Sequence, residues 1–363
     1  MTPVLPSLFN PSNDMALAAN VRQYLPPKRI QQMEADLADL AQVWEGTRFA
    51  GPWGWSLATK QRYRHMDIAD DLLPSDEWLA QLRALSSRQF ACEYIHHLLA
   101  DLSSTHPNTS PLLLGHEMHW LQAGKPLAHE MRPSSAVSPL TSSPFPLILK
   151  LPWSSSGRGV FVLPPDAPLS TLHSKLSTQT GFLVDRFYAD KTLDFAMEFF
   201  IHPDESPNHS AGTAPQVEFL GYSVFQASDH GTYGFNYVES QDELLRRIIG
   251  EPDGNDGRDG LNGQDESIGQ IEELLDALVA YHKVHLARTS YRGPLGIDML
   301  KTADGHIHPC LEINFRLNMG ILALLLHQRL GSHATAQLTP PRPAGFAARV
   351  ERGKLMITYK AGA

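Results

Sequence analysis

The most restrictive feature of this sequence is a pair of strand-like segments near its C-terminal end. Residues 296–301 and 306–314 mix apolar and polar side chains, and the turn between them contains Asp304 and Gly305. An Asp-Gly pair between two such segments indicates a β-hairpin. The second strand continues as Glu-Ile-Asn-Phe-Arg-Leu-Asn over residues 312–318. The expected hairpin therefore carries a set of polar side chains that are able to meet on one face.

The length of the turn decides which of these side chains meet. A three-residue loop would pair Asp298 with Cys310 and bring Asp298, Glu312 and Asn314 to one face, whereas a two-residue turn would send Glu312 and Asn314 to the opposite face. Three oxygen donors on one face suit a hard cation such as Mg²⁺, and Arg316 follows as a donor to a phosphoryl group. An ordinary hairpin with a polar, solvent-facing side would have the same spacing.

A second candidate site lies upstream, where a lysine ends a predicted strand. Lys150 belongs to the apolar segment 147–151 and precedes a loop of small residues. Such a loop exposes backbone N–H groups and hydroxyls that bind phosphate. A flexible surface hairpin is the alternative interpretation. The loop residues are Ser154, Ser155, Ser156, Gly157, Arg158 and Gly159.

Taken together, the two segments resemble the ATP-grasp superfamily of ATP-dependent carboxylate ligases in their order and separation. The similar stretches are residues 147–163, 182–188 and 291–320, about half of the chain. They are similar to the family's strand lysine and glycine-rich lid, its adenine hinge, and its Asp…Glu-x-Asn-x-Arg metal segment. The resemblance implies an α/β (α+β) fold, in which an N-terminal Rossmann-like pre-ATP-grasp lobe precedes two α+β subdomains that enclose ATP.

The resemblance also implies which residues bind the nucleotide. Lys150 would contact adenine and the α-phosphate, while the loop 154–159 would cover the phosphates. The family's usual lysine at the start of a helix is matched by Arg88, and arginine also binds phosphate. The adenine edge would be held by Asp185, Arg186, Phe187 and Tyr188.

For the chemical step, the resemblance implies a metal site and a group of catalytic residues. Asp298 and Glu312 would hold one Mg²⁺, and Glu312 and Asn314 a second, with Mn²⁺ as a possible substitute. Arg316, assisted by Asn318, would stabilise the transferring γ-phosphoryl group. The implied catalytic residues are Arg316, Asn318 and Lys150.

Three parts of the sequence do not match the family pattern or allow two interpretations. The family's ribose-binding acid falls near Thr192, where Asp190 and Asp194 are imperfect substitutes. Asn13 and Asp14 either touch substrate or cap a helix, and capping is favoured. Trp53 and Trp55 either stack on a ligand or close a core.

Candidates for the acceptor side are Tyr291, Arg292 and residues 231–236.

The periodicity of apolar residues gives a coarse map of the remaining chain. We expect helices over 13–20, 30–43, 75–85, 88–102 and 271–285, with Ser12 capping the first of them, and strands over 4–9, 147–151, 159–163, 181–187, 194–201, 217–225 and 354–359. The predicted domains are an N-terminal lobe (1–85), an ATP-grasp domain (86–335) and a C-terminal tail (336–363). Within the second domain we expect a lid subdomain (130–190), a metal-binding subdomain (191–335) and a mobile acidic loop (250–267).

Charge and cysteine content exclude several functional classes. The net charge is -9, and the loop 250–267 holds six acids and one base, which contributes more than half of it. Nucleic-acid and membrane-surface partners are therefore not expected. The two cysteines, Cys92 and Cys310, have no disulfide or metal spacing and suit a reducing compartment. The start of the sequence lacks a signal-peptide pattern, so we expect a cytoplasmic protein.

The function implied by the resemblance is an ATP- and Mg²⁺-dependent ligase. It would convert a carboxylate into an acyl phosphate and join it to an amine or similar nucleophile, with release of ADP and phosphate. Alternatives are an ATP-grasp kinase that phosphorylates a small molecule, and a catalytically inactive nucleotide-binding protein. The sequence leaves open which small carboxylate and amine are used, an amino acid or peptide included, and the oligomeric state.

Overall fold

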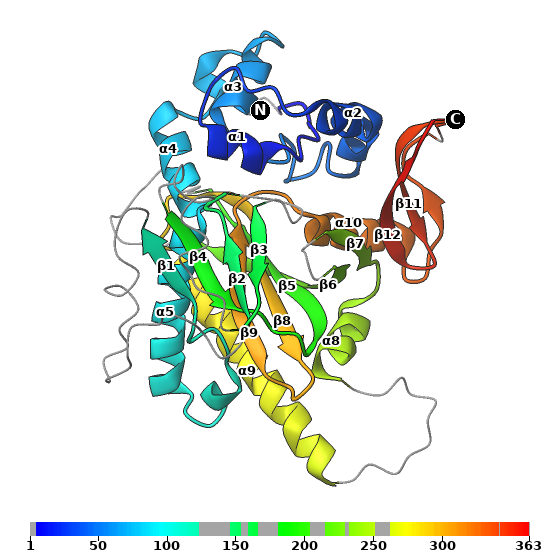
Figure 1. The fold of residues 1–363 in the computed structure, drawn as a ribbon. Coiled ribbons are helices and arrows are strands. Elements are labelled where there is room, and N and C mark those ends of the chain that lie inside the picture. Colours follow the sequence, from blue (N-terminus) through cyan, green and yellow to red (C-terminus); the bar gives the residue numbers. More distant parts are fainter. Residues whose placement is uncertain are drawn as a thin grey trace.

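The computed structural model describes residues 5–122, 146–153, 159–165, 181–203, 215–228, 232–250, 262–340 and 342–362. They form the predicted mixture of helices and sheets, with a helical N-terminal region above two β-sheets (Figure 1). The predicted lid residues 154–158 and most of the acidic loop, 251–261, lie outside the described residues. No described helix is long and apolar enough to cross a membrane.

The N-terminal region is helical because serine caps and apolar stripes recur along it. The side chains of Ser56, Ser75 and Ser87 each accept a hydrogen bond from a backbone N–H in the first turn of the following helix. The elements are α1 (Asn13–Ala19), α2 (Lys28–Asp36), η1 (Ala38–Val43), α3 (Leu57–Arg64), η2 (Asp70–Leu72), α4 (Asp76–Leu85), α5 (Arg88–Thr105) and η3 (Ser110–Leu112).

Three sequence expectations differ from the structure in this region. Over residues 5–9 the structure has no strand, and only a parallel bridge joins Leu8 to Pro52. The resemblance had implied a Rossmann-like sheet at this place. The predicted helix 30–43 divides into α2 and a 3₁₀ helix after Asp36. Ser12 does not cap α1, because its hydroxyl donates to Glu34 instead, at 2.5 Å.

The smaller sheet has four antiparallel strands in the order β1-β4-β2-β3. Its strands are β1 (His119–Gln122), β2 (Leu147–Lys150), β3 (Val160–Leu163) and β4 (Gly181–Arg186). The strand containing Lys150 pairs with β4, so this lysine lies beside the start of the predicted adenine hinge.

The larger sheet has eight strands in the order β10-β11-β12-β7-β6-β5-β8-β9. They are β5 (Lys191–Ile201), β6 (Val217–Ala227), β7 (Tyr233–Tyr237), β8 (Gly293–Thr302), β9 (Ile307–Asn314), β10 (Ala336–Gln337), β11 (Gly345–Glu351) and β12 (Lys354–Lys360). The accompanying helices are α8 (Gln241–Ile249), α9 (Asn262–Leu286) and α10 (Met319–Leu330). The C-terminal tail therefore adds a hairpin to this sheet, rather than the single strand that we predicted.

The hairpin β8–β9 confirms the predicted face, although not the predicted pairing. The loop has three residues, with Gly305 at a φ of 88°, and the backbone N–H of Thr302 donates to the carbonyl of His306 at 3.0 Å. Asp298 pairs with Glu312 and not with Cys310, because the register shifts between Asp298 and Leu300. The opposing stretch of β9 contains Pro309, which has no N–H to donate to the ladder. The shift is by two positions, so the expected side chains still share a face.

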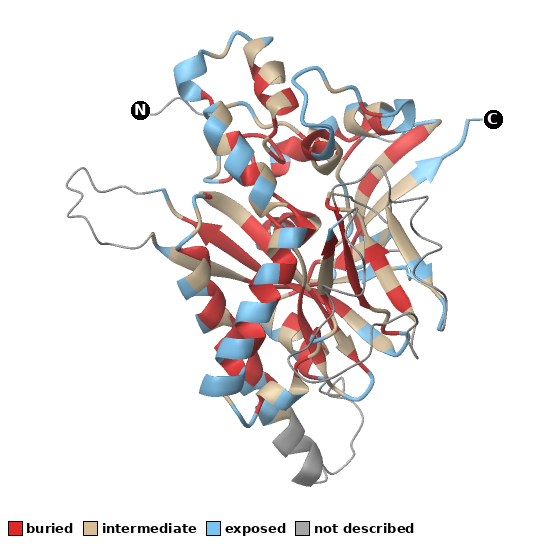
Figure 2. Cartoon of the chain, turned by 60° about the vertical axis from the view of Figure 1, so that its left-hand side comes forward, coloured by how far each residue is buried: buried red, intermediate tan, exposed pale blue. Residues whose placement is uncertain are grey.

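Three apolar clusters hold these elements together. The largest joins α5 and α9 to one face of the larger sheet, and Figure 2 shows the buried residues of these helices facing inward. A second joins the N-terminal region to α10 and to the β11–β12 hairpin. A third fills the smaller sheet. The opposite face of the larger sheet, together with the smaller sheet and the N-terminal helices, is left to line a cavity.

Candidate functional site

One cavity of about 520 Å³ lies between the two sheets and the N-terminal region. It is large enough for a ligand of ordinary size, since such pockets span roughly 300–1,000 Å³. Most residues singled out from the sequence line it. They are Arg88, Lys150, Asp185, Arg186, Phe187, Tyr188, Asp298, Glu312, Asn314, Arg316 and Asn318. Gly159 does not line it, and the other lid residues lie outside the described part of the chain.

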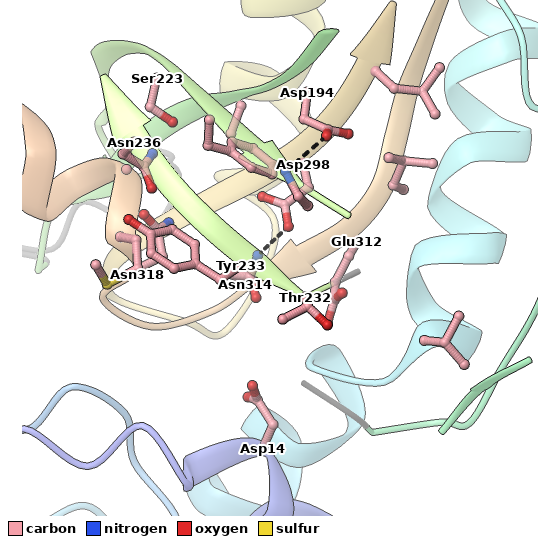
Figure 3. Close-up of a pocket in the computed structure, with 18 of the residues that line it drawn as sticks. Asp14, Asp194, Ser223, Thr232, Tyr233, Asn236, Asp298, Glu312, Asn314 and Asn318 are labelled. Carbon is pink, nitrogen blue, oxygen red and sulfur yellow. Dashed lines mark hydrogen bonds between the residues drawn. The ribbon is translucent and has the colours of Figure 1, made fainter. Parts of the chain in front are cut away.

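The predicted metal ligands meet at one wall of this cavity. The Asn314 side-chain amide donates to Oδ2 of Asp298 at 3.0 Å (Figure 3). Burial, and the charges of Glu312 and Glu198, raise the pKa of Asp298 well above its usual range. The Arg88 guanidinium donates to Oε2 of Glu312 at 2.8 Å. The carboxylates of Asp298 and Glu312 thus repel each other, and Arg88 offsets the negative charge of Glu312.

This donor set fits a divalent cation that takes most of its ligands from elsewhere. Within the described ranges, no group of three or more His, Cys, Asp or Glu side chains is placed to hold a metal ion. Asp298 and Glu312 supply two carboxylates, and Asn314 supplies an amide oxygen. Mg²⁺ binds in this way in phosphate-processing sites, through one or two carboxylates, phosphate oxygens and waters. A cation here would also relieve the repulsion that raises the pKa of Asp298.

Arg316 is held by a residue from the opposite end of the chain. Its Nε and Nη2 donate to the two carboxylate oxygens of Asp14 at 3.0 and 2.8 Å, and Nη2 also donates to Oδ1 of Asn314 at 2.8 Å. Figure 3 shows Asp14 extending from α1 toward this part of the cavity. The favoured interpretation of Asp14 as a helix cap is therefore incomplete, since its side chain belongs to the site.

Two cationic residues face the acids from the other side of the cavity. Arg88 begins α5, and its Nη1 donates to the carbonyl of Leu151 at 2.9 Å, just after the strand that ends at Lys150. Burial, followed by the nearby charge of Arg88, lowers the pKa of Lys150. The start of a helix and the end of a strand therefore bring two cations toward the paired acids.

The predicted hinge lies at the end of β4. The Asp185 side chain is fully buried, with Oδ2 at 3.1 Å from Nε2 of His308, and Oδ1 accepts from the backbone N–H of Arg186 at 2.7 Å. The ring of Tyr188 packs edge-on against His308. Although Oδ2 of Asp185 approaches His308, neither atom forms a hydrogen bond within the described residues, and the carboxylate is oriented through Oδ1. The other hinge groups available to a ligand are backbone groups and the Phe187 and Tyr188 rings.

One of the three ribose candidates lines the cavity. Asp194 does so, and its Oδ2 accepts from Nζ of Lys191 at 2.8 Å. Thr192 instead donates to the carbonyl of Lys301 at 3.2 Å, on the exposed side of the strand. A bulge in β5 between Lys191 and Leu193 explains this difference, because it interrupts the alternation by which residues two positions apart would face the same side.

A buried acid that sequence reasoning missed lies beside the predicted metal ligands. Glu198 is 1% exposed, and its two oxygens accept from Nδ2 of Asn318 at 2.7 Å and from Oγ of Ser223 at 2.8 Å. Burial raises its pKa to about 7. Gly296 and Gly320 leave the room that this carboxylate occupies. The available signal was a lone acid within the apolar run of β5, which is costly unless it is satisfied.

The predicted acceptor residues are only partly brought together. Tyr291 is buried and donates to the carbonyl of Pro294 at 2.8 Å, while Arg292 donates to the carbonyl of Thr289, also at 2.8 Å, and neither lines the cavity. From the segment 231–236, the lining residues are Thr232, Tyr233 and Asn236. Trp53, left open between ligand and core, is buried in the second cluster and also lines the cavity.

Comparison with known proteins gives distant matches among solved structures. No protein-family model and no curated protein matches this chain. N5-carboxyaminoimidazole synthetase from Staphylococcus aureus, complexed with ADP, matches with a TM-score of 0.42 at 8% identity, covering 98% of this chain and 93% of that one. Carboxyaminoimidazole ribonucleotide synthase from Aspergillus clavatus, complexed with ATP, matches with a TM-score of 0.39 at 12% identity, covering 90% and 78%.

A further match covers less of its counterpart. The biotin carboxylase domain of the Hydrogenobacter thermophilus 2-oxoglutarate carboxylase has a TM-score of 0.32 at 9% identity, and the match covers 50% of this chain and 36% of that one. Because the likeness is distant, the chemistry of this chain has to be argued from its own side chains.

Proposed function

We propose that this chain is an ATP-grasp ligase, which uses ATP and Mg²⁺ to activate a carboxylate and join it to an amine. The observation that carries the proposal is the arrangement around Glu312. Its carboxylate lies on the strand paired with Asp298 and accepts from Arg88, while Arg316 and Asn314 follow on the same chain segment. Two acids, an amide and two arginines in one cavity match the needs of a metal-bound triphosphate.

In this proposal ATP lies between the two sheets. Its base lies at the end of β4, near Phe187 and Tyr188, and its phosphates extend past Lys150 toward Arg88. Asp194 lies on the cavity side of β5 and is the acid available to the ribose. A partly buried lysine and a buried arginine bind phosphate more strongly than fully exposed ones do, because the surrounding dielectric is lower.

The reaction has two balanced steps. A carboxylate oxygen of the acceptor attacks the γ-phosphorus, the bond from that phosphorus to the β–γ bridging oxygen breaks, and ADP leaves with the electron pair. The amine nitrogen then attacks the carbonyl carbon of the acyl phosphate, phosphate leaves, and the nitrogen loses a proton to solvent. Arg316 stabilises the charge on the transferring group, and Asp14 orients its guanidinium plane.

A divalent cation would be held by Asp298 and Glu312, with Asn314 as a further oxygen donor. When bound, it supplies charge neutralisation on the phosphoryl oxygens. Asn318 contributes differently, because its Oδ1 accepts from the backbone N–H of Ile321 and its Nδ2 holds Glu198. It therefore fixes the start of α10, immediately after Arg316 and Leu317.

Measurement of ADP release tests the proposal. Purified protein is incubated with Mg²⁺, ATP and a panel of carboxylic acids, with hydroxylamine present to trap acyl phosphates as hydroxamates. We expect acid-dependent ADP and hydroxamate in equal amounts, and loss of both in Glu312→Gln and Asn314→Ala. Glu351→Gln, at an exposed position on β11, is the matched control and keeps full activity.

Two other results would replace the proposal. A stable phosphorylated product that does not react with hydroxylamine would identify a kinase. Nucleotide binding without ADP release for any acid would identify an inactive nucleotide-binding protein. Unchanged turnover in Glu312→Gln would show that the paired acids have no part in the reaction.

A further inference from the structure

One end of the cavity is lined by apolar side chains from three separate parts of the chain. All of them belong to the second apolar cluster or pack against it, and each contributes to the cavity surface. Phe9 and Trp53 pack edge to face, with ring centroids 5.2 Å apart. We call this surface the apolar wall. It consists of Phe9, Met33, Trp53, Met319, Phe346 and Ile357.

The apolar wall begins next to the phosphoryl end of the site and not at the adenine end. The backbone N–H of Leu317 donates to the carbonyl of Trp53 at 2.9 Å, so the N-terminal region docks directly after Arg316. Met319 follows at the start of α10. The hinge residue Phe187, by contrast, follows β4 of the smaller sheet, and its backbone N–H donates to the carbonyl of Pro146 at 2.9 Å. A molecule on the wall would therefore approach the γ-phosphate, where the acceptor has to lie.

Strand register connects this wall to the paired acids across one face of the larger sheet. Asp298 pairs with Ala196, and Ala196 pairs with Ser223 on β6. Two positions along β6 the same face carries Phe225, which pairs with Asp194 on one side and with Asn236 on the other. Asn236 in turn pairs with Leu355, two positions before Ile357. Side chains two apart on a strand share a face, so the surface is continuous from the acids to the tail hairpin. At ~4.8 Å per strand, four strand spacings separate Asp298 from Ile357, roughly 19 Å across the sheet.

Asn236 is an uncharged polar residue on this surface. The Asn236 side chain lines the cavity, and the residue is 2% exposed (Figure 3). Among the described residues, none forms a hydrogen bond with its side-chain amide. An amide that faces the cavity is available to form hydrogen bonds with a bound ligand. The surface beyond the phosphoryl end therefore combines the apolar wall with Asn236, which is able to orient a ligand.

We propose that the acceptor of this enzyme is a carboxylic acid with an extended apolar portion, which lies along the apolar wall while its carboxylate faces the γ-phosphate. This inference rests on the proposed ligase function and adds the substrate class. The length of the surface excludes an acid as short as acetate from reaching both ends. Two methionines on the wall, Met33 and Met319, adapt to aliphatic or aromatic groups.

A series of straight-chain acids tests the proposal. Hydroxamate formation with ATP, Mg²⁺ and hydroxylamine is measured for acetate, butyrate, hexanoate and octanoate, and for adipate as the matched acid with a second charge. We expect kcat/KM to rise about fourfold per added methylene, from the free energy of burying each one. Adipate should perform no better than acetate. Equal kcat/KM for hexanoate and adipate would overturn the proposal.

A pair of variants on β12 assigns the effect to the wall. Ile357→Asp places a charge on the cavity side, and Thr358→Asp places the same charge on the opposite face of the same strand. We expect Ile357→Asp to abolish the dependence on chain length and Thr358→Asp to keep it, with Mg²⁺-ADP binding retained in both. Unchanged chain-length dependence in Ile357→Asp would contradict the assignment.

Calorimetric titration with hexanoate and adipate separates failure of this inference from failure of the ligase function. If the wild type binds hexanoate, Ile357→Asp does not, and no acid causes ADP release, the apolar site is supported and the ligase function is refuted. Turnover of polar acids with no hexanoate binding would retain the ligase and refute the apolar site. Absence of both hexanoate binding and hexanoate turnover also overturns the inference.

Discussion

Asp14 and Arg316 form a two-pronged ion pair, although 302 residues separate them in the sequence. The carboxylate comes from the first helix of the chain and the guanidinium from the segment that follows β9. Both side chains are largely shielded from solvent, at 13% and 15% exposed. The pair therefore ties the N-terminal region to the chemical centre and fixes the plane of the arginine that would face the phosphoryl group.

Replacement of Asp14 should reduce catalysis more than nucleotide binding. Asp14→Asn removes the charge partner of Arg316 and leaves its guanidinium free to turn. A charged hydrogen bond contributes about 1.5–3 kcal/mol, so we expect kcat for ADP release to fall about tenfold to hundredfold with little change in the KM for ATP. Steady-state kinetics measure both. Asp71→Asn, at an exposed position in η2, is the control, and an unaltered kcat in Asp14→Asn would contradict an orienting role.

Glu198 should make the stability of the metal-free protein fall as pH rises. Its pKa in the folded state is about 7, above the usual value for glutamate, so the folded state holds the proton that the unfolded state loses first. The stabilisation is complete below the unfolded pKa of about 4.3 and is lost as pH rises to about 7, a decrease of about 3 kcal/mol for a fully buried group. Urea unfolding from pH 5 to pH 8 measures the decrease.

The Glu198→Gln variant isolates this contribution. An amide keeps an oxygen for the Asn318 donor but does not titrate, so the decrease between pH 5 and pH 7 should be largely absent in the variant. The Glu351→Gln variant, at an exposed site, should follow the wild type. An equal pH dependence in Glu198→Gln and in the wild type would show that another group is responsible.

The sequence specified the hairpin that carries the site better than it specified the contacts around it. Asp298 and Glu312 were expected on one face, and they are, because a two-position register shift preserves the alternation of side chains. The shift itself depends on how β9 pairs around Pro309, which turn length alone does not determine. The β11 strand was missed, although Phe346, Ala348 and Val350 alternate as a half-buried strand requires.

Contacts between distant segments were the part that sequence reasoning could not supply. Nothing near Asp14 indicates Arg316, because their approach depends on how the N-terminal helices dock on α10. Glu198 lies in an apolar strand, and its satisfaction depends on Ser223 and Asn318 from two other elements. Local patterns describe elements and faces, whereas these contacts follow from packing between elements.

Divalent cations should reverse the effect of removing Asp298. Without metal, Asp298→Asn removes a partly buried carboxylate whose charge is opposed by desolvation and by Glu312, so we expect its melting temperature to equal or exceed that of the wild type. With Mg²⁺ and ADP, the wild type should gain stability by ligand linkage, and the variant should gain much less. Thermal unfolding with EDTA, with Mg²⁺, and with Mg²⁺ and ADP gives the comparison. Equal Mg²⁺-ADP stabilisation of both proteins would place the cation elsewhere.

The two glycines beside Glu198 should tolerate no side chain, which gives a structural test of the buried network. A Cβ at Gly320 would clash with Oε1 of Glu198 and with Oγ of Ser223, in a well-packed region. We expect Gly320→Ala to lower the free energy of unfolding by about 1–3 kcal/mol, the usual range for overpacking. Gly269→Ala, on the exposed side of α9 with nothing within 4 Å, should be neutral or stabilising, because alanine is the better helix former.

A double-mutant cycle attributes the Gly320 effect to Glu198. Shortening of the acid in Glu198→Ala frees the space that the alanine at position 320 needs, so the second substitution should cost much less in that background than in the wild type. Urea unfolding of the wild type, the two single variants and the double variant gives the coupling energy. Additive free energies would mean that Gly320 is restricted by its backbone or by Ser223 alone, and the close packing of Glu198 against α10 would have to be abandoned.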